Sequence, residues 1–332
     1  MVKALFIWQP HAELKAHLCD HMDRVEGLAY VFPGEDEKKI TEAEPCPDAQ
    51  ILVGWRPELE LLESLPELKL VLNPGAGVQH HFPERAALFQ ARGIELCNGH
   101  GNAGFTAEHG FGMLLTLSRR MLEHDRWMRE GRWRTGDKEA PARSLRGMKV
   151  GLAGYGHIGR KMATLLQAFG AEPLVMNRTG LCEDGFEAFP SSESGAFAAK
   201  ADSVIVSLPL TPQTKGMIGR DFLEQLGEDG LLVNIGRGEV VEEKALYRAL
   251  VEGVISGAAL DTWYEYSPEP DEQGRKYPYM QPFHELDNVL LSPHRAASPF
   301  GDLERWEDIL DNLRRFVEGE PLRNRVDLNE GY

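Results

Sequence analysis

The stretch VGLAGYGHIG, residues 150–159, places three glycines in GxGxxG spacing directly after an apolar run. They are Gly154, Gly156 and Gly159. This spacing serves a tight turn, close approach of the backbone to a pyrophosphate, and close packing of a helix on a strand. His157 and Ile158 begin a helical segment whose first N–H groups and positive dipole end suit phosphates. Because a strand precedes the turn and a helix follows it, the stretch predicts a parallel α/β domain that binds a dinucleotide.

The remainder of the chain repeats this alternation of apolar runs and helix-like segments. Around the glycine turn, strands are predicted at 149–153, 174–176, 203–207, 231–235, 255–260 and 289–291. Before residue 100, the strand candidates are KALFIW, AQILVGW, LKLVLNPGAG and GIELCNG. One long helix is expected from Ala107 to Trp127, and an amphipathic helix after Pro299 that ends at Gly319. The pattern predicts an α/β protein with two doubly wound, parallel-sheet domains.

Composition narrows the classes of partner. With 332 residues and 42% hydrophobic residues, the chain is long enough for two globular domains. A net charge of −16 argues against nucleic-acid and anionic-membrane binding, and no apolar run is long enough to cross a bilayer. The four cysteines are scattered without metal-ligand spacing, so we expect no metal site and no disulfide framework. A cytoplasmic location is the simplest expectation.

The predicted strand at 174–176 ends where a dinucleotide-binding fold usually carries an acid for the ribose 2′-OH of NAD. Asn177 stands there instead, followed by Arg178 and Thr179. Asn177 removes the repulsion of a 2′-phosphate, while Arg178 and Thr179 supply donors for it. The sequence therefore predicts NADP as the cofactor. The alternative is that Arg178 points to solvent and NAD is also accepted.

Three polar residues directly follow three predicted strands. Arg237 follows 231–235, Asp261 follows 255–260, and His294 follows 289–291. Ligands of parallel α/β sheets bind outside the carboxyl ends of the strands, so these side chains are expected beside the dinucleotide.

This combination suits hydride transfer to or from a carbon that bears an oxygen. A histidine exchanges the hydroxyl proton near neutral pH, and an arginine holds a carboxylate and polarises the adjacent carbonyl. Taken singly, His294 is better explained as a strand-end residue bonded to backbone, and Arg237 as a surface ion-pair partner. Their joint placement beside the glycine turn favours catalysis.

These residues, together with NPGAGVQHH, TAEHGFGMLLTLSRR, SLPLTPQTKGMI, LLVNIGRGEVVEEKAL, GAALD and LSPH, resemble the D-isomer-specific 2-hydroxyacid dehydrogenase family over nearly the whole chain. The resemblance implies that Arg237 orients the substrate, that His294 is the acid/base, and that Asp261 holds the nicotinamide amide. It also implies that N–H groups of Gly75, Ala76 and Gly77 receive the substrate carboxylate. Pro209, Ile235 and Ala296 are expected to contact the cofactor.

The resemblance further implies a Rossmann domain at 118–296 and a discontinuous, flavodoxin-like substrate domain at 1–117 plus 297–332. A homodimer is expected, with RWMREGRWR near its interface. The predicted function is reduction of small 2-oxo acids, such as glyoxylate or hydroxypyruvate, with NADPH. Alternatives on the same scaffold are a formate- or phosphite-type dehydrogenase and a non-enzymatic, dinucleotide-sensing corepressor.

One departure from the family concerns the carboxylate that partners the catalytic histidine. The family commonly continues from the aspartate as Asp-Val-Phe-x-x-Glu-Pro, whereas this chain has DTWYEYSPEP. Tyr266 therefore stands at the Glu position, and Glu269 reaches the Glu-Pro dipeptide only with a three-residue insertion. We expect Glu269 to supply the carboxylate. Without a carboxylate, the pH optimum for reduction should shift downward.

Overall fold

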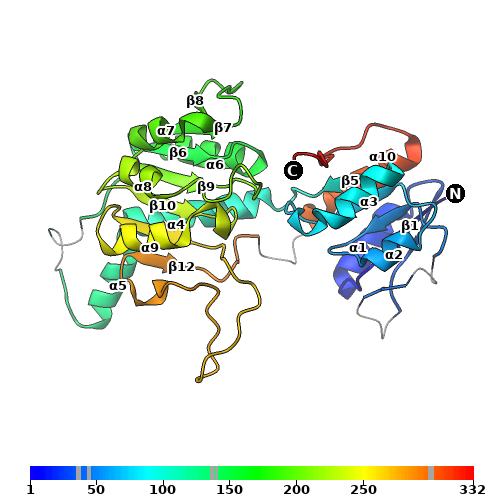
Figure 1. Cartoon of the computed structure of the whole chain (residues 1–332), viewed down its shortest axis with the longest axis horizontal. Coiled ribbons are helices and arrows are strands. Elements are labelled where there is room, and N and C mark those ends of the chain that lie inside the picture. Colours follow the sequence, from blue (N-terminus) through cyan, green and yellow to red (C-terminus); the bar gives the residue numbers. More distant parts are fainter. Residues whose placement is uncertain (35–38, 43–45, 135–137, 139–140, 298–302) are drawn as a thin grey trace. The chain divides into compact units, whose positions relative to one another are not determined.

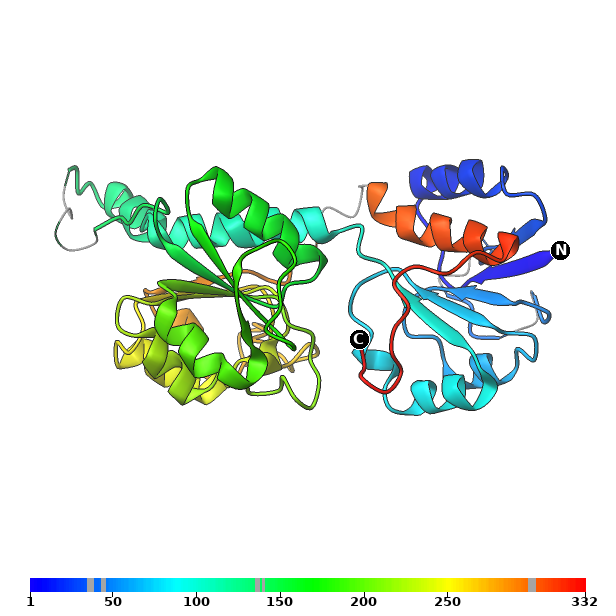
Figure 2. The same ribbon diagram turned by 90° about the horizontal axis from the view of Figure 1, so that it is seen from above.

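The computed structural model divides the chain into two compact units, residues 1–102 with 299–332 and residues 103–298. The described residues are 1–34, 39–42, 46–134, 138, 141–297 and 303–332. Each unit is a parallel sheet between two layers of helices, as Figures 1 and 2 show. The two parallel-sheet domains predicted from the sequence are thus present.

The first unit has a five-stranded parallel sheet in the order β2-β1-β3-β4-β5, the doubly wound flavodoxin-like order. Its strands are β1 (Val2–Phe6), β2 (Leu28–Val31), β3 (Ile51–Val53), β4 (Leu70–Asn73) and β5 (Glu95–Asn98). Leu14 and Leu18 of α1 (Ala12–Met22) share one buried cluster with Leu313 of α10 (Glu307–Glu318). On the other face, α2 (Leu59–Glu63) and α3 (Glu84–Arg92) bury apolar residues such as Leu62 and Phe89.

The second unit has a seven-stranded parallel sheet in the order β12-β11-β10-β9-β6-β7-β8. The strands are β6 (Lys149–Ala153), β7 (Glu172–Asn177), β8 (Glu187–Pro190), β9 (Ser203–Val206), β10 (Leu231–Asn234), β11 (Gly257–Leu260) and β12 (Val289–Leu291). If the strands are numbered within the unit, the order is 7-6-5-4-1-2-3, which is the Rossmann order 3-2-1-4-5-6 with one further strand. The direction of the strand order reverses between β6 and β9. Ligands of such sheets bind at that switch point, which is where the glycine turn follows β6.

Helices cover both faces of this second sheet (Figure 2). On one face lie α4 (Ala103–Ser118) and α6 (His157–Ala168). On the other lie α7 (Ser194–Lys200), α8 (Arg220–Leu226) and α9 (Glu243–Val251). Most of α4 falls inside the predicted substrate segment 1–117, whereas α4 packs within this second unit against α6, β10 and β11.

The helix expected from Ala107 to Trp127 is wrong as one continuous element. It is two helices, α4 and α5 (Met121–Arg129), because Arg120 adopts a left-handed conformation with φ 52. The guanidinium of Arg120 donates to Ser256 Oγ at 2.8 Å and to Glu123 Oε1 at 3.2 Å, which fixes the chain at this bend. By contrast, α10 ends at Gly319 in a left-handed cap, as predicted.

Two observed strands, β2 and β8, are not among the strands predicted from the sequence. Each lies at an edge of its sheet, and neither contains a fully buried residue. An edge strand pairs on one side only, so it needs no continuous apolar run and leaves a weak sequence pattern.

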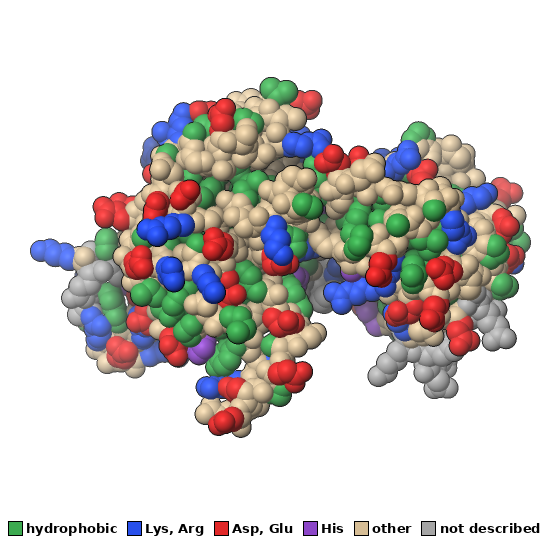
Figure 3. Space-filling model, viewed as in Figure 1, with side chains coloured by type: hydrophobic (Ala, Val, Ile, Leu, Met, Phe, Trp, Pro, Cys, Tyr) green, Lys and Arg blue, Asp and Glu red, His purple; other side chains and the backbone are tan. Residues whose placement is uncertain are grey.

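The surface carries charges of both signs. On the face shown in Figure 3, acidic and basic side chains are intermixed over the coloured residues rather than gathered by sign. Among the described residues, no helix has the length and apolar character to cross a membrane.

Candidate active site

The glycine-rich turn lies between β6 and α6, at the carboxyl edge of the seven-stranded sheet. Gly154 has φ +102, which other residues adopt only with strain. A Cβ on Gly159 would lie 2.5 Å from the carbonyl oxygen of Gly154, so only glycine permits this close packing. A Cβ on Gly156 would meet nothing within 4 Å, so open space adjoins the backbone where a pyrophosphate would approach. The turn therefore fits a dinucleotide.

Helix α6 starts at this turn with His157 and Ile158 in its first turn. No side chain caps the helix at Gly156. The first N–H groups of a helix have no partner within the helix, and with the positive dipole end they form an anion site.

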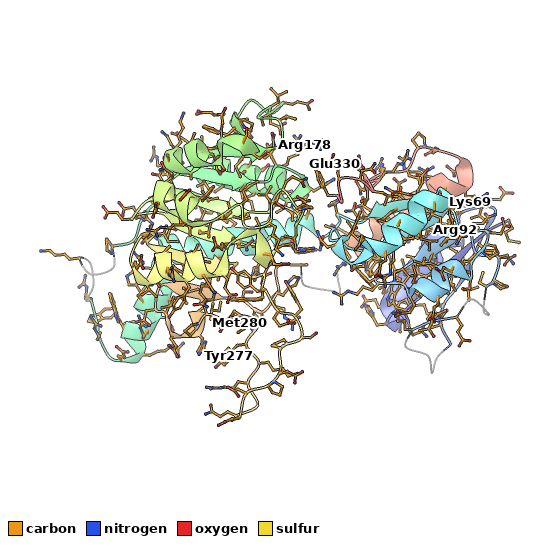
Figure 4. The ribbon with its side chains drawn as sticks, viewed as in Figure 1. Lys69, Arg92, Arg178, Tyr277, Met280 and Glu330 are labelled. Atoms are coloured by element: carbon orange, nitrogen blue, oxygen red, sulfur yellow. The ribbon has the colours of Figure 1, made fainter. Side chains whose placement is uncertain are left out.

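Asn177 ends β7 and shapes the loop that carries Arg178 and Thr179. Its Oδ1 accepts the backbone N–H groups of Thr179 at 3.0 Å and Gly180 at 2.8 Å, and its Nδ2 donates to the carbonyl of Leu181 at 2.7 Å. The side chains of Arg178, labelled in Figure 4, and Thr179 are exposed. The loop thus presents a guanidinium and a hydroxyl where an NAD-binding domain has an acid.

Two further predicted cofactor residues, Pro209 and Ile235, follow β9 and β10 at the same edge. The N–H of Ile235 donates to Val206 O at 3.0 Å, and its buried side chain joins the cluster under α4 and α6. The carbonyl of Pro209 accepts the Thr214 hydroxyl at 2.6 Å. Both residues therefore make backbone hydrogen bonds at the carboxyl edge of this sheet.

Asp261 follows β11 and is 1% exposed. Its carboxylate accepts the hydroxyl of Ser292 and the backbone N–H groups of Arg295 at 2.7 Å and Ala296 at 2.9 Å. All three donors flank His294, so Asp261 holds the loop that presents the histidine. The expected contact of Asp261 with a nicotinamide amide stays a prediction.

His294 follows β12 with φ 56, an uncommon backbone conformation that often marks a functional position. Its Nδ1 lies 2.8 Å from the hydroxyl of Tyr266, and the two rings meet edge to face at 5.3 Å. The surrounding protein lowers the pKa of the His294 imidazole, chiefly through lost hydration. Asp261 opposes this shift, and the charges of Arg237 and Arg295 add to it.

Arg237 follows β10 on extended backbone and is half-buried. Its Nη1 donates to the carbonyl of Gly236 at 2.7 Å, and its own carbonyl accepts Nδ2 of Asn234 at 3.0 Å. Burial lowers the pKa of the guanidinium, and Tyr266 acts in the opposite direction. An arginine still remains charged at neutral pH, so a partly desolvated cation stands at this edge.

The structure does not bring Glu269 to His294. Glu269 is exposed and makes no hydrogen bond or ion pair with any residue that the structure describes. Tyr266 occupies the place beside Nδ1, because the loop after β11 turns back at Trp263, whose N–H donates to the Tyr266 hydroxyl at 3.3 Å.

In the first unit, Gly75, Ala76 and Gly77 form a loop after β4. Asn73 Nδ2 donates to the carbonyls of Gly75 and Gly77, and Asn98 Nδ2 donates to that of Ala76 at 2.8 Å. Within the described part of the chain, the N–H groups of the three residues donate to no partner. Successive N–H groups held in this way suit a carboxylate.

No role is predicted from the sequence for His109 and Ser292, although both lie in stretches that resemble the family. His109 of α4 places Nε2 3.1 Å from Ser292 Oγ and 3.6 Å from Asp261 Oδ1. The partners are more than 150 positions from His109 along the chain. The topology brings them together, and the spacing of these residues along the chain does not predict the contact.

The fold and the edge-of-sheet residues define a dinucleotide-dependent oxidoreductase of 2-hydroxy acids. The family model for the NAD-binding domain of D-isomer specific 2-hydroxyacid dehydrogenases matches residues 111–296. The chain therefore belongs to that family.

Relatives over most of the chain agree with this assignment. A glyoxylate/hydroxypyruvate reductase of Arabidopsis thaliana is 32% identical over 273 residues, 81% of this chain and 80% of the relative. A glyoxylate reductase of Pyrococcus furiosus is 33% identical over 297 residues, 85% of this chain and 83% of the relative.

Solved structures show the same architecture. A D-isomer specific 2-hydroxyacid dehydrogenase of Xanthobacter autotrophicus in complex with NADPH and MES has a TM-score of 0.82 at 28% identity, covering 100% of this chain and 99% of that chain. A glyoxylate/hydroxypyruvate reductase of Sinorhizobium meliloti in complex with NADP and malonate has a TM-score of 0.73 at 27% identity, covering 99% and 98%.

Proposed function

We propose that this chain reduces small 2-oxo acids, such as glyoxylate or hydroxypyruvate, with NADPH. The observation that carries the proposal is the placement of Arg237 and His294 after β10 and β12, on the sheet edge that holds the glycine turn. The names of the relatives from Arabidopsis thaliana and Pyrococcus furiosus support this substrate class.

The proposed chemistry divides between the cofactor and the chain. A bound reduced nicotinamide supplies the hydride. Arg237 binds the carboxylate of the 2-oxo acid and polarises its carbonyl through charge-assisted hydrogen bonds. His294 gives a proton from Nε2 to the carbonyl oxygen as negative charge develops there, because Nδ1 is held by Tyr266. The expectation that the N–H groups of Gly75–Gly77 in the first unit receive a carboxylate stays a separate prediction.

A substrate panel tests the reaction. Steady-state turnover is measured with NADPH and NADH against glyoxylate, hydroxypyruvate and pyruvate, and with both oxidised cofactors against formate and phosphite. We expect reduction of at least one short 2-oxo acid. Oxidation of formate or phosphite alone identifies the alternative dehydrogenase, and cofactor binding without any turnover favours the dinucleotide-sensing corepressor.

The preference for NADP is proposed to rest on Arg178. Charge-assisted hydrogen bonds to a phosphate contribute roughly 1.5–3 kcal/mol, so R178A should lower the ratio of kcat/KM for NADPH over NADH by about 10- to 150-fold. NADP and NADPH in the two solved relatives support this cofactor.

Arg220 supplies the matched control for that measurement. It lies on α8, where it pairs with Glu224, and is 77% exposed. R220A removes the same charge and should leave the cofactor ratio unchanged. An R178A enzyme with the wild-type ratio contradicts the assignment of this arginine.

The homodimer and the cytoplasmic location stay predictions. Exposed apolar side chains on and after α5, such as Met128 at 53% and Trp133 at 71%, favour a protein interface there. Light scattering of the purified chain measures the oligomeric state directly.

A further inference from the structure

Tyr266 holds the ring nitrogen of His294 that the proposed reaction does not use. The two residues come from the loops after β11 and β12, which pair in parallel, so the sheet brings the loops side by side. The Tyr266 hydroxyl lies 2.8 Å from Nδ1 of His294 and accepts the N–H of Trp263 at 3.3 Å. This hydroxyl is therefore fixed from two directions.

The donors and acceptors around the Tyr266 hydroxyl indicate which atom carries the hydrogen between Tyr266 and His294. A phenol has one hydrogen to donate and two lone pairs to accept with. Among the described residues, the Tyr266 hydroxyl has two hydrogen-bond neighbours: Trp263 N–H, which can only donate, and His294 Nδ1, which can accept. Because Nδ1 is the acceptor within reach of the phenolic hydrogen, we assign that hydrogen to Nδ1. A neutral His294 then accepts at Nδ1 and carries its own proton at Nε2. A carboxylate at the same place has no hydrogen and requires the opposite tautomer, with the proton on Nδ1.

The charges around the ring decide how readily it takes a second proton. Asp261 favours the imidazolium, whereas Arg237, Arg295 and lost hydration disfavour it. Tyr266 adds no negative charge to this balance, because lost hydration raises the pKa of its own hydroxyl, and the opposing influence of Trp263 N–H and Arg237 does not cancel that rise. Near neutral pH, Tyr266 thus orients the ring without stabilising its charged form.

We propose that Tyr266 is a positioning residue that holds neutral His294 as the Nε2–H tautomer and, being uncharged, confines proton donation to the acidic side of neutrality. The inference rests on the proposed function for its kinetic consequence but not for its structural content. During reduction, the Nε2–H bond of the imidazolium breaks as the O–H bond of the product forms. The ring is left with its proton on Nδ1 and regains the Nε2–H tautomer by exchange with water.

Two substitutions separate orientation from charge. Y266F keeps the ring and removes the hydroxyl, so we expect loss of the Nε2–H preference and a roughly tenfold lower kcat with KM within about twofold. Y266E supplies the carboxylate common in the family, so the pKa of His294 should rise by about one unit. The upper pH limit of reduction should move by the same amount.

Tyr277 provides the matched control. It lies in the same loop, is labelled in Figure 4, and stacks on His284 at 4.2 Å rather than on His294. Y277F makes the same chemical change and should alter neither the His294 tautomer nor its pKa.

The tautomer and the pKa are read by ¹⁵N NMR of the histidine ring in the full-length protein without substrate. The Nε2–H form in the wild type, its loss in Y266F and a raised His294 pKa in Y266E support the proposal. A wild-type ring protonated on Nδ1, or a Y266F ring unchanged in tautomer and pKa, overturns it. Because these spectra need no turnover, an inactive protein refutes the proposed function and leaves this test intact.

Discussion

Two alanine substitutions in the cofactor turn should impair different properties: G159A should lower the stability of the fold, and G156A should weaken the binding of NADPH. A Cβ on Gly159 would lie 2.5 Å from a backbone oxygen, which cannot rotate away as a side chain can. Overpacking of this kind costs about 1–3 kcal/mol, and the helix propensity gained by alanine offsets less than 1 kcal/mol near a helix start. A net loss of about 2 kcal/mol lowers the melting temperature of a unit of this size by roughly 4–8 °C.

Gly156 differs because its added methyl meets nothing within 4 Å and its φ of −95 is open to alanine. Because Gly156 is the N-cap of α6, the G156A substitution should lower the free energy of unfolding by less than about 1 kcal/mol. The methyl enters the space where a pyrophosphate approaches the backbone. Loss of one charge-assisted hydrogen bond, about 1.5–3 kcal/mol, should weaken NADPH binding by roughly 10- to 150-fold.

The assay pairs thermal unfolding with titration of NADPH fluorescence for G156A, G159A and the wild type. Gly112 is the control, since it is exposed on α4, and a Cβ there also meets nothing within 4 Å. G112A should bind NADPH as the wild type does. Wild-type affinity in a folded G156A shows that the turn does not hold the pyrophosphate, and wild-type melting of G159A refutes the packing argument.

Two further predictions concern buried polar groups. D261N should destabilise the second unit by about 2–4 kcal/mol in thermal unfolding, because the amide replaces an acceptor of two backbone N–H groups and the Ser292 hydroxyl. Burial lowers the pKa of His81 to about 3, so between pH 6.5 and 3 the unfolded chain binds a proton that the folded chain excludes. The free energy of unfolding should therefore decrease by up to about 1.4 kcal/mol for each pH unit that the pH is lowered through this window. In urea titrations at pH 6 and 4.5, the free energy of unfolding of H81F should depend less on pH than that of the wild type.

Most of the fold could be predicted because buried parallel strands are continuous apolar runs. Two of the six strands predicted around the glycine turn, Lys149–Ala153 and Val289–Leu291, match the observed bounds residue for residue. The helix break at Arg120 was not predictable, since the apolar spacing runs through it. The guanidinium contact with Ser256 fixes the bend, and that residue is 136 positions away.

The site follows a similar division. Arg237, Asp261 and His294 were placed at one edge by a rule of parallel sheets, which needs only the strand ends. The partner of His294 was not predictable, because choosing between Tyr266 and Glu269 depends on the path of a loop. Neither apolar periodicity nor spacing determines that path.

Trp263 explains why the loop takes the path that selects Tyr266. Its indole Nε1 donates to the carbonyl of Ser292 at 2.8 Å, which ties the loop after β11 to the loop after β12. A Cβ on Gly238 would lie 2.2 Å from the carbonyl oxygen of Trp263, so the loop after β10 packs directly against the same residue. The loop that carries Arg237 and the hydroxyl of Tyr266 thus both contact the backbone of one buried residue, Trp263, whose indole is tied to Ser292. Glu269 lies three residues further along the chain and is exposed, so Tyr266 rather than Glu269 partners the ring.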